Sequence, residues 1–257
     1  MYEAMMIASS GLHNQQRRLD TIANNVANVN TVGYKNSRLD FREALYTAGY
    51  VPGPARTPEG NQQKGHGLMV AGITRDFIGG SFLRTERQFD LAIEGEGFFA
   101  LQGLDGETQY TRNGRFSLSV EDDGVYLVNA DGYYILDAQL DKIQIPAHTE
   151  SINVNDNNMI TFKVGDEEST AVLGVFTFRN LMGLESIGES NYTESVASGE
   201  RMLAESARAV QGYIEGSNVD LAQEMTRMIR TQRAFTLSSR ALITADEMEG
   251  IANNMRR

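Results

Sequence analysis

Apolar residues recur every seven positions at the start of the chain. Two series, offset by three residues, make up this pattern: Met5, Leu12, Leu19 and Val26, and Ala8, Gln15, Ile22 and Val29. This spacing is that of a heptad seam, so it predicts an amphipathic helix with Gln15 as the polar member of the seam. We expect the helix to end near Gly33, because glycine readily adopts the left-handed conformation of a helix cap.

The end of the chain has the same periodicity. One seven-residue series contains Leu221, Met228, Phe235 and Leu242, and a second set widens the stripe: Met225, Ile229 and Ile243. Ser217 or Asn218 can cap the start of this helix, where the helix dipole also favours the negative charges of Asp220 and Glu224. The pattern persists to Met255, which predicts a helix of about 35–40 residues.

Between these helices the apolar period changes to two, which predicts strands. The expected strands are Leu68–Phe77, Asp90–Gln102, Gln109–Val120, Val125–Val128, Tyr133–Leu136, Ser151–Val154, Met159–Val164 and Val172–Arg179. Turn dipeptides separate them: Asp105-Gly106, Asp123-Gly124, Asp131-Gly132 and Gly165-Asp166. Many short strands with glycine-containing turns indicate an antiparallel β-domain.

The pattern divides the chain into three parts. Residues 1–35 and 217–257 form a helical domain, residues 67–216 form a β-rich domain, and residues 36–66 connect them. The connecting part contains "YVPGPARTPEGNQQKGHG", which holds three of the four prolines, so an extended arm is expected. The predicted fold class is therefore mixed but mainly β: a central antiparallel β-domain flanked by long terminal helices that pair as a coiled coil.

The periodic pattern alone does not decide what the two helices pack against. One apolar stripe buries too little surface to stabilise so long a helix, because helices in proteins owe most of their stability to tertiary packing. Packing against other subunits is the simplest source of further apolar contact. The alternative is that both helices pack on their own β-domain.

Composition excludes several classes of protein. The formal net charge is −11, with 34 acidic and 23 basic residues, which argues against general binding to nucleic acid. There is no cysteine, so disulfides, thiol catalysis and cysteine-ligated zinc are excluded. We expect no cleaved signal peptide, because the opening MYEAMMIASS lacks a basic region followed by a long apolar one. No apolar run approaches the ~18–20 residues that span a bilayer.

Candidate metal sites are weak. The three histidines, His13, His66 and His148, have no second ligand at a spacing typical of metal binding. The segment "NVNDNN" loosely resembles a calcium loop, but a loop starting at Asp156 has Thr161 where the pattern requires glycine. A turn rich in asparagine fits this segment better, so we expect no cofactor and no metal.

The segment "IEGEGFFAL" contains the only pair of residues that suggests catalysis. In an extended strand, Glu94 and Glu96 would lie on one face about 6.5–7 Å apart, a separation compatible with glycoside hydrolysis. The same spacing is common on a solvated strand face. Gly95 and Gly97 fit a bulge or a close backbone approach at least as well.

Several segments together resemble one family, the bacterial flagellar basal-body rod and hook proteins. The opening "MIASSGLHNQQRRLDTIANNVANVNTVGYKNSRLDF" is similar to its N-terminal motif, "ANN-x-AN-x-x-T-x-G-[YF]-K". "LAIEGEGFFAL", "YTRNGRFSL" and "ADGYYIL" resemble its β-domain, while "GLESIGESNYTES" and "GYIEGSNVDLAQEMTRMIRTQRAFTLSSRALITADEM" resemble its C-terminal part. The resemblance covers nearly the whole chain, and the length favours a rod protein, distal-rod-like first and proximal-rod-like second.

The resemblance implies a structural protein of the flagellar basal body, in the periplasm or cell envelope, rather than an enzyme. Copies would stack helically through their terminal helices into the shaft that transmits torque from motor to hook, with the β-domains outside. Implied partners are further copies, other rod and hook proteins and the flagellar type III export apparatus, without nucleic acid or membrane insertion. Two alternatives remain: a secreted β-domain enzyme acting on peptidoglycan, and a hook-associated or adhesin-type binding module.

The resemblance and the two apolar stripes together give a predicted assembly interface. Its members are Leu12, Leu19, Ile22, Asn24, Asn25, Val26, Asn28, Gly33, Tyr34, Asn218, Leu221, Met225, Met228, Ile229, Gln232, Phe235 and Leu242. The asparagines lie opposite the apolar seam of a helix that turns ~100° per residue, and amides can both donate and accept hydrogen bonds. A solvated asparagine face is the alternative. We expect Asn25→Leu to weaken polymerisation more than the stability of the monomer.

Overall fold

The structure is a computed structural model, in which two compact units can be recognised. It describes residues 2–45, 47–48, 63–103, 105–146, 149, 151–155, 157–164, 167–204 and 206–255. Unit 1 comprises Met1–Ala27, Ser37–Arg75 and Asp220–Arg257, and unit 2 comprises Asn28–Asn36 and Asp76–Val219. The predictions for His148, the Gly165-Asp166 turn, the loop starting at Asp156 and residues 46 and 49–62 of the arm fall outside the described residues.

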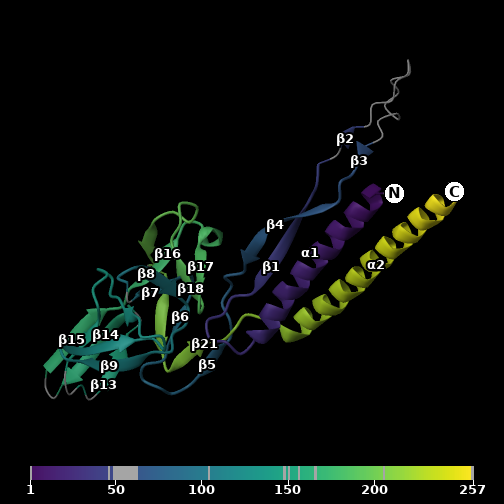
Figure 1. Cartoon of the computed structure of the whole chain (residues 1–257). Helices are drawn as coiled ribbons and strands as arrows, with labels where there is room; N and C mark the ends of the chain where they lie inside the picture. Colours follow the sequence, from purple (N-terminus) through teal and green to yellow (C-terminus); the bar gives the residue numbers. More distant parts are fainter. Residues whose placement is uncertain are drawn as a thin grey trace. The chain divides into compact units, whose positions relative to one another are not determined.

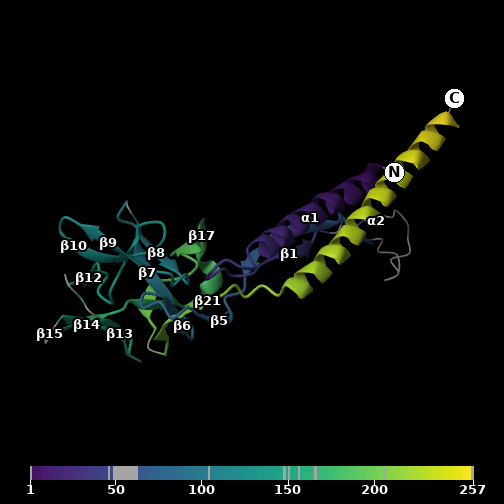
Figure 2. The same cartoon turned by 90° about the horizontal axis from the view of Figure 1, so that it is seen from below.

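Two long helices run along unit 1. Helix α1 (Tyr2–Ala27) and helix α2 (Leu221–Asn254) lie side by side in opposite directions, so that the start of α1 lies beside the C-terminal part of α2 (Figure 1; Figure 2). Helix α1 ends six residues before Gly33, so Gly33 is not its cap, contrary to the prediction. Helix α2 has 34 residues, and Asp220 caps it by accepting hydrogen bonds from the Ala222 and Gln223 amides, rather than Ser217 or Asn218.

Few large apolar side chains are fully buried on either helix. On α1, Ile22 of the predicted seam is buried together with Asn14 and Asn25, and Leu12 and Leu19 are half-buried. On α2 the fully buried residues are small or polar: Glu224, Thr231 and Ala245. The large apolar residues of α2 therefore occupy the margins of the buried face or point away from it.

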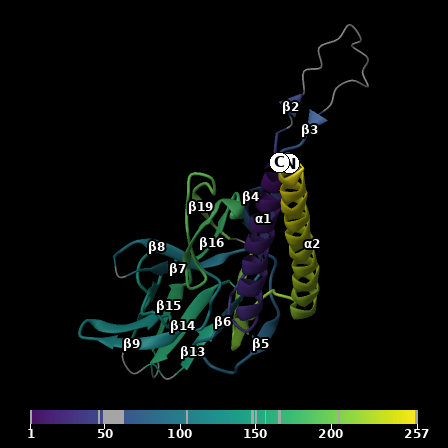
Figure 3. The ribbon, with the colours of Figure 1, turned by 45° about the vertical axis from the view of Figure 1, so that its right-hand side comes forward.

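A β-hairpin packs on α1. Strand β1 (Ser37–Glu43) pairs with strand β4 (Leu68–Arg75), and the short strands β2 (Thr47–Ala48) and β3 (Gln63–Lys64) continue the pairing. The hairpin and α2 lie along different sides of α1 (Figure 3). Part of the predicted extended arm is thus a strand, because Leu39 and Phe41 alternate with charged residues and face inward.

Unit 2 is an antiparallel β-domain. Every pairing between its described strands is antiparallel. A short 3₁₀ helix, η2 (Leu181–Gly183), interrupts the strands. The strands are β5 (Phe82–Arg84), β6 (Leu91–Glu94), β7 (Phe98–Gln102), β8 (Thr108–Thr111), β9 (Ser117–Glu121), β10 (Gly124–Val128), β11 (Tyr134–Ile135), β12 (Gln144–Ile145), β13 (Ser151–Val154), β14 (Met159–Val164), β15 (Glu167–Val172), β16 (Val175–Phe178), β17 (Glu185–Gly188), β18 (Asn191–Thr193), β19 (Arg201–Leu203), β20 (Arg208–Gln211) and β21 (Tyr213–Glu215).

The sheets of unit 2 differ in size. The largest has ten strands and follows the order β12-β10-β11-β7-β8-β18-β17, with β16, β19 and β9 attached beside this path. Strands β13, β14 and β15 form a second sheet, while β20 pairs with β6 and β21 pairs with β5. Two apolar clusters fill the unit, one around Phe99 and Phe116 and one around Phe98, Tyr110 and Phe178.

The prediction of a mainly β chain flanked by two helices is confirmed. Strands Ser151–Val154 and Met159–Val164 have the predicted bounds. Two predicted long strands are each broken in two, at Gly95–Gly97 and around Arg112. The first break follows from Gly95, whose φ of +102° is outside the range of a regular strand.

Gly33 lies where two parts of unit 2 meet at backbone distance. Its φ is +68°, and a Cβ atom there would lie 2.6 Å from the Asn113 amide nitrogen. Both the backbone conformation and the lack of space require glycine. The predicted left-handed glycine is therefore present, but it permits close packing instead of capping a helix.

We expect Gly33→Ala to destabilise unit 2 more than Gly106→Ala does. Gly106 also has a positive φ, +80°, but nothing lies within 4 Å of a Cβ atom at that position. Both variants carry left-handed strain of about 1–2 kcal/mol, and Gly33→Ala adds overpacking of about 1–3 kcal/mol. Free energies of unfolding from urea titrations of the two variants would measure the difference, and equal losses would contradict the close approach at Gly33.

Candidate assembly interface

The predicted interface residues of α1 lie in different environments. Leu12, Leu19 and Val26 are half-buried and Ile22 is 4 % exposed, as expected for an apolar seam. Asn24 is exposed. The three predicted asparagines thus do not form one face, since Asn28 lies beyond the end of the helix and Asn25 is buried.

Asn25 joins three elements of unit 1. Its Nδ2 donates to the Ser37 carbonyl oxygen at 2.8 Å, and its Oδ1 accepts from the Ser37 amide at 3.0 Å. Nδ2 also lies 3.4 Å from Glu224 Oε2, and Glu224 Oε1 accepts from Arg227 Nη1 at 2.6 Å. Asn25 is 1 % exposed, so its amide is used within the chain. The predicted amide contact exists, but its target is β1 and α2 of the same chain.

Further polar side chains of α1 bind the hairpin. Ser10 Oγ and Asn14 Nδ2 both donate to the Leu68 carbonyl oxygen, at 3.1 and 2.6 Å. The Arg18 guanidinium lies over the Phe41 ring, 5.7 Å from its centroid. These contacts satisfy the hairpin backbone with helix side chains, which no periodic pattern in the sequence indicates.

The predicted interface residues of α2 leave apolar surface in contact with solvent. Leu221 and Met225 are each 44 % exposed, Ile229 is 52 % exposed and Gln232 is exposed as well. Met228, Phe235 and Leu242 are half-buried. The exposed apolar surface continues along α2 with five further residues: Leu237, Ile243, Met248, Ile251 and Met255.

A buried ionic cluster in unit 2 contains Lys35, Arg112 and Glu215. Lys35 Nζ lies 2.7 Å from Glu215 Oε1, and Arg112 Nη1 lies 3.1 Å from Glu215 Oε2, with all three side chains at most 3 % exposed. Arg112 also donates to the carbonyl oxygens of Ile93 and Gly95. Sequence reasoning named Lys35 only as a motif residue and missed the other two. A charged residue inside an otherwise apolar or turn-forming stretch, as in "YTRNGRF" and "YIEGS", is the signal that could have found them.

The cluster holds two cations and one carboxylate, and the pKa shifts reflect this imbalance. Burial alone would raise the pKa of Glu215, but Arg112, Lys35 and the Gly80 amide hold it below its ordinary value. Burial lowers the pKa of Lys35, although Glu215 opposes this shift. The single carboxylate is thus well compensated, whereas the ammonium shares its counter-charge with Arg112.

The remaining predicted residues belong to unit 2. The Gly33 amide donates to the Glu215 carbonyl oxygen at 2.8 Å, and the Asn218 amide donates to the Tyr34 carbonyl oxygen at 3.4 Å. Asn218 Oδ1 accepts from the Asn36 amide at 2.7 Å. These residues, predicted to face other copies, hold parts of their own chain together.

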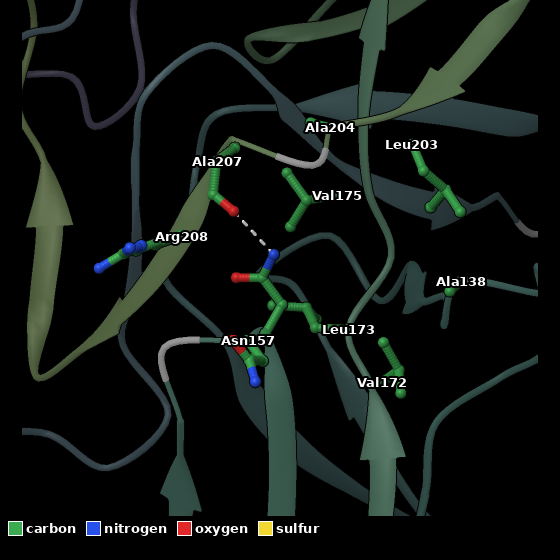
Figure 4. A pocket seen from close by; sticks show the side chains of 10 residues that line it. Ala138, Asn157, Val172, Leu173, Val175, Leu203, Ala204, Ala207 and Arg208 are labelled. Carbon is green, nitrogen blue, oxygen red and sulfur yellow. Dashed lines mark hydrogen bonds between the residues drawn. The ribbon is translucent and has the colours of Figure 1, made fainter.

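The two glutamates considered for catalysis do not share a strand. Strand β6 ends at Glu94, and Gly95 turns the chain before Glu96, so the spacing of an extended strand does not apply. Figure 4 shows a pocket of about 370 Å³ in unit 2, lined by Ala138, Asn157, Asn158, Val172, Leu173, Val175, Leu203, Ala204, Ala207 and Arg208. Its lining holds no carboxylate, so this pocket offers no pair of acids.

The described histidines and acids make no metal site. His13 and His66 are both exposed, and within the described part of the chain no group of three or more histidine, aspartate or glutamate residues could hold a metal ion. Neither α1 nor α2, over its described residues, is long and apolar enough to cross a membrane.

Comparison with known proteins decides the family. The chain is 36% identical to the flagellar basal-body rod protein FlgG of Borreliella burgdorferi and 35% identical to that of Bacillus subtilis, in each case over 100% of both chains. The chain belongs to the flagellar basal-body rod protein family. It is also 28% identical to the flagellar hook-basal body complex protein FlhP of Bacillus subtilis, over 100% of both chains.

Three family models match separate segments of this rod-family chain. Residues 5–35 match the flagella basal body rod protein model, residues 92–162 match the flagellar hook protein FlgE/F/G D1 domain, and residues 210–255 match the flagellar basal body rod FlgEFG protein C-terminal model. Lys35, Arg112 and Glu215 fall one in each segment. The ionic cluster therefore joins the three parts by which the family is recognised.

We expect Asn25→Leu to destabilise unit 1 of the monomer, which reverses the expectation from sequence. Leucine would leave the half-buried Ser37 amide and carbonyl without the asparagine, and an unsatisfied group costs up to about 1–3 kcal/mol, depending on its burial. Asn24→Leu, at an exposed position, is the matched control and should change stability by less than about 0.5 kcal/mol. Thermal loss of helical circular dichroism would measure both, and equal stability of the two variants would contradict the role of Asn25.

We expect Glu215→Gln to lower the free energy of unfolding of unit 2 at neutral pH. We also expect this free energy to depend less on pH in the acid range than it does in the parent. Removing the carboxylate leaves two buried cations, at a cost of about 3–5 kcal/mol. In the parent chain the unfolded state binds more protons than the folded state between the ordinary pKa of 4.5 and the lower folded pKa. The parent therefore loses stability as the pH falls through this range, and the variant lacks this loss.

Urea titrations between neutral pH and about pH 3.5 would measure the effect of Glu215→Gln. Glu94→Gln, which changes an exposed glutamate of the same unit, should leave stability and its pH dependence close to those of the parent. Parallel pH curves for the parent and Glu215→Gln would show that the cluster does not set the acid response.

Proposed function

We propose that this protein is a structural subunit of the flagellar basal-body rod, whose copies polymerise helically through α1 and α2 into the shaft that transmits torque from motor to hook. The observation that carries this proposal is the similarity to rod proteins over the full length of the chain. Relatives that match this chain over their full length imply the same kind of assembly.

The exposed apolar surface of α2 supports assembly through the helices. In α2 the buried positions are filled by Glu224, Thr231 and Ala245, while Met225 and Ile229 point into solvent. Such an arrangement is unfavourable for a helix that acts alone, because apolar side chains are stabilised by burial. A second copy would cover this surface and supply the missing apolar contact.

We further propose that α1 and α2 pair as a coiled coil within the assembled rod. The heptad spacing of both helices favours it, and Gln15 on the α1 seam would act as the polar position that fixes the register. In the single chain, Gln15 Oε1 is buried without a hydrogen-bond partner among the described residues.

The proposed partners are further copies of the chain, other rod and hook proteins and the flagellar type III export apparatus, at the flagellar basal body. Export without a cleaved signal peptide and the distal-rod-like position stay predictions from sequence. The family is structural, which argues against the alternative of a peptidoglycan-acting enzyme.

We expect Ile229→Glu to block incorporation into basal bodies without destabilising the monomer. The side chain is 52 % exposed in the single chain, so glutamate is tolerated there, whereas a charge buried between copies is costly. Gln223→Glu places the same charge on an exposed position of α2 about 120° around the helix from Ile229 and serves as the control. Purified hook–basal bodies from cells carrying each variant would be probed for the protein, and swimming would be measured.

Normal incorporation of Ile229→Glu would contradict assembly through this face of α2.

A deletion test should remove residues 1–27 rather than 1–35, because Lys35 belongs to the ionic cluster of unit 2. With residues 28–36 retained, we expect the β-domain to fold and the chain to stay outside the rod.

A further inference from the structure

We infer that unit 2 closes on itself through a clasp that fixes the attachment points of the hairpin and of α2. The clasp consists of segments 33–36, 76–81 and 215–218, and it goes beyond the proposed function because it acts within a single chain. The chain enters unit 2 at Asn28 and again at Asp76, and it leaves unit 2 after Asn36 and after Val219. Segments 33–36 and 76–81 adjoin the two ends of the hairpin, and segment 215–218 ends one residue before the chain leaves for α2.

Three residues of the clasp form a closed ring of hydrogen bonds. The Asn36 amide donates to Asn218 Oδ1 at 2.7 Å, Asn218 Nδ2 donates to the Asp76 carbonyl oxygen at 2.8 Å, and the Asp76 amide donates to the Asn36 carbonyl oxygen at 2.9 Å. Each segment is thus bonded to both of the others. Because Asn218 supplies an acceptor and a donor at once, it completes the ring with a single side chain.

An ionic layer lies beside this ring. Lys35 Nζ donates to the Ile78 carbonyl oxygen at 2.8 Å and to Glu215 Oε1 at 2.7 Å. The Gly80 amide donates to the same carboxylate oxygen at 2.8 Å. A second set of bonds thus repeats the connections of the ring, and these bonds are stronger because one or both partners are charged.

The backbones of the clasp are in direct contact. The Gly216 amide donates to the Ser81 carbonyl oxygen at 2.8 Å, and the Gly33 amide donates to the Glu215 carbonyl oxygen at 2.8 Å. A Cβ atom on Gly80 would overlap the Gly216 carbonyl oxygen. Glycine at these positions is what allows three segments to meet without intervening side chains.

Arg112 anchors the clasp to the β-core. It binds Glu215 Oε2 and the carbonyl oxygens of Ile93 and Gly95, and its guanidinium lies 5.4 Å from the centre of the Phe98 ring. A force along any one linker therefore reaches the other two linkers and the core. The attachment points stay in place whether or not the helices have found their partners.

The test is amide hydrogen exchange of the full-length chain, resolved by residue with NMR. Lys35→Met removes the ammonium but leaves Arg112 on Glu215, and Asn218→Ala opens the ring without removing a charge. Lys142→Met is the control, since Lys142 is an exposed lysine of the same unit. The amides to follow are those of Gly33, Asn36, Asp76, Gly80 and Gly216, with the amides of β7 and β8 as the core reference.

We expect the clasp amides to exchange faster together while the core reference stays within about twofold. The increase should be at least about 100-fold in Lys35→Met and at least about tenfold in Asn218→Ala. The Asp76 amide is decisive in Asn218→Ala, because it is bonded to Asn36 rather than to Asn218. Faster exchange at Asn36 alone would overturn the clasp in favour of independent bonds, and equally faster exchange in the core would overturn it in favour of ordinary core packing.

Discussion

The fold of unit 2 depends on one buried carboxylate. Glu215 is 1 % exposed, and removing a carboxylate from water is tolerated only when charges and donors surround it. Its partners come from distant parts of the chain, since Lys35 lies 180 residues away and Arg112 lies 103 residues away. Unit 2 can therefore be complete only when both of its terminal segments have reached the β-core. The lack of a Cβ atom at Gly33 and Gly80 leaves the space for that approach.

Unit 1 is held together by a different balance of forces. Its two helices meet through small and polar residues of α2, such as Thr231 and Glu224, while methionines and isoleucines of α2 remain exposed. Burying these exposed methionines and isoleucines would stabilise the helices, but no described part of the single chain covers them. A chain that closes its β-domain internally and leaves apolar helix surface uncovered is suited to assembly, in which other copies complete the packing.

Periodic features of this chain could be predicted from sequence, and contacts between distant residues could not. Heptads and alternation locate α1, α2, β13 and β14, because apolar residues recur along each of them with the period of a helix or a strand. The same reasoning misses β1, whose Leu39 and Phe41 precede a stretch rich in proline and glycine. It also misses Arg112 and Glu215, because an ion pair across such separations has no local pattern. Asn25 was predicted to make an amide contact, but periodicity could not indicate that its target is Ser37.

Two asparagine side chains bind the backbone where the chain passes from unit 2 to unit 1 between Asn36 and Ser37. The amides of these two consecutive residues both donate to an asparagine side chain. Asn218 Oδ1 accepts from the first, in unit 2, and Asn25 Oδ1 accepts from the second, in unit 1. An amide side chain offers the same donor and acceptor as a peptide group but is not part of the backbone. Asn25 and Asn218 are therefore used where the backbone leaves one unit for the other.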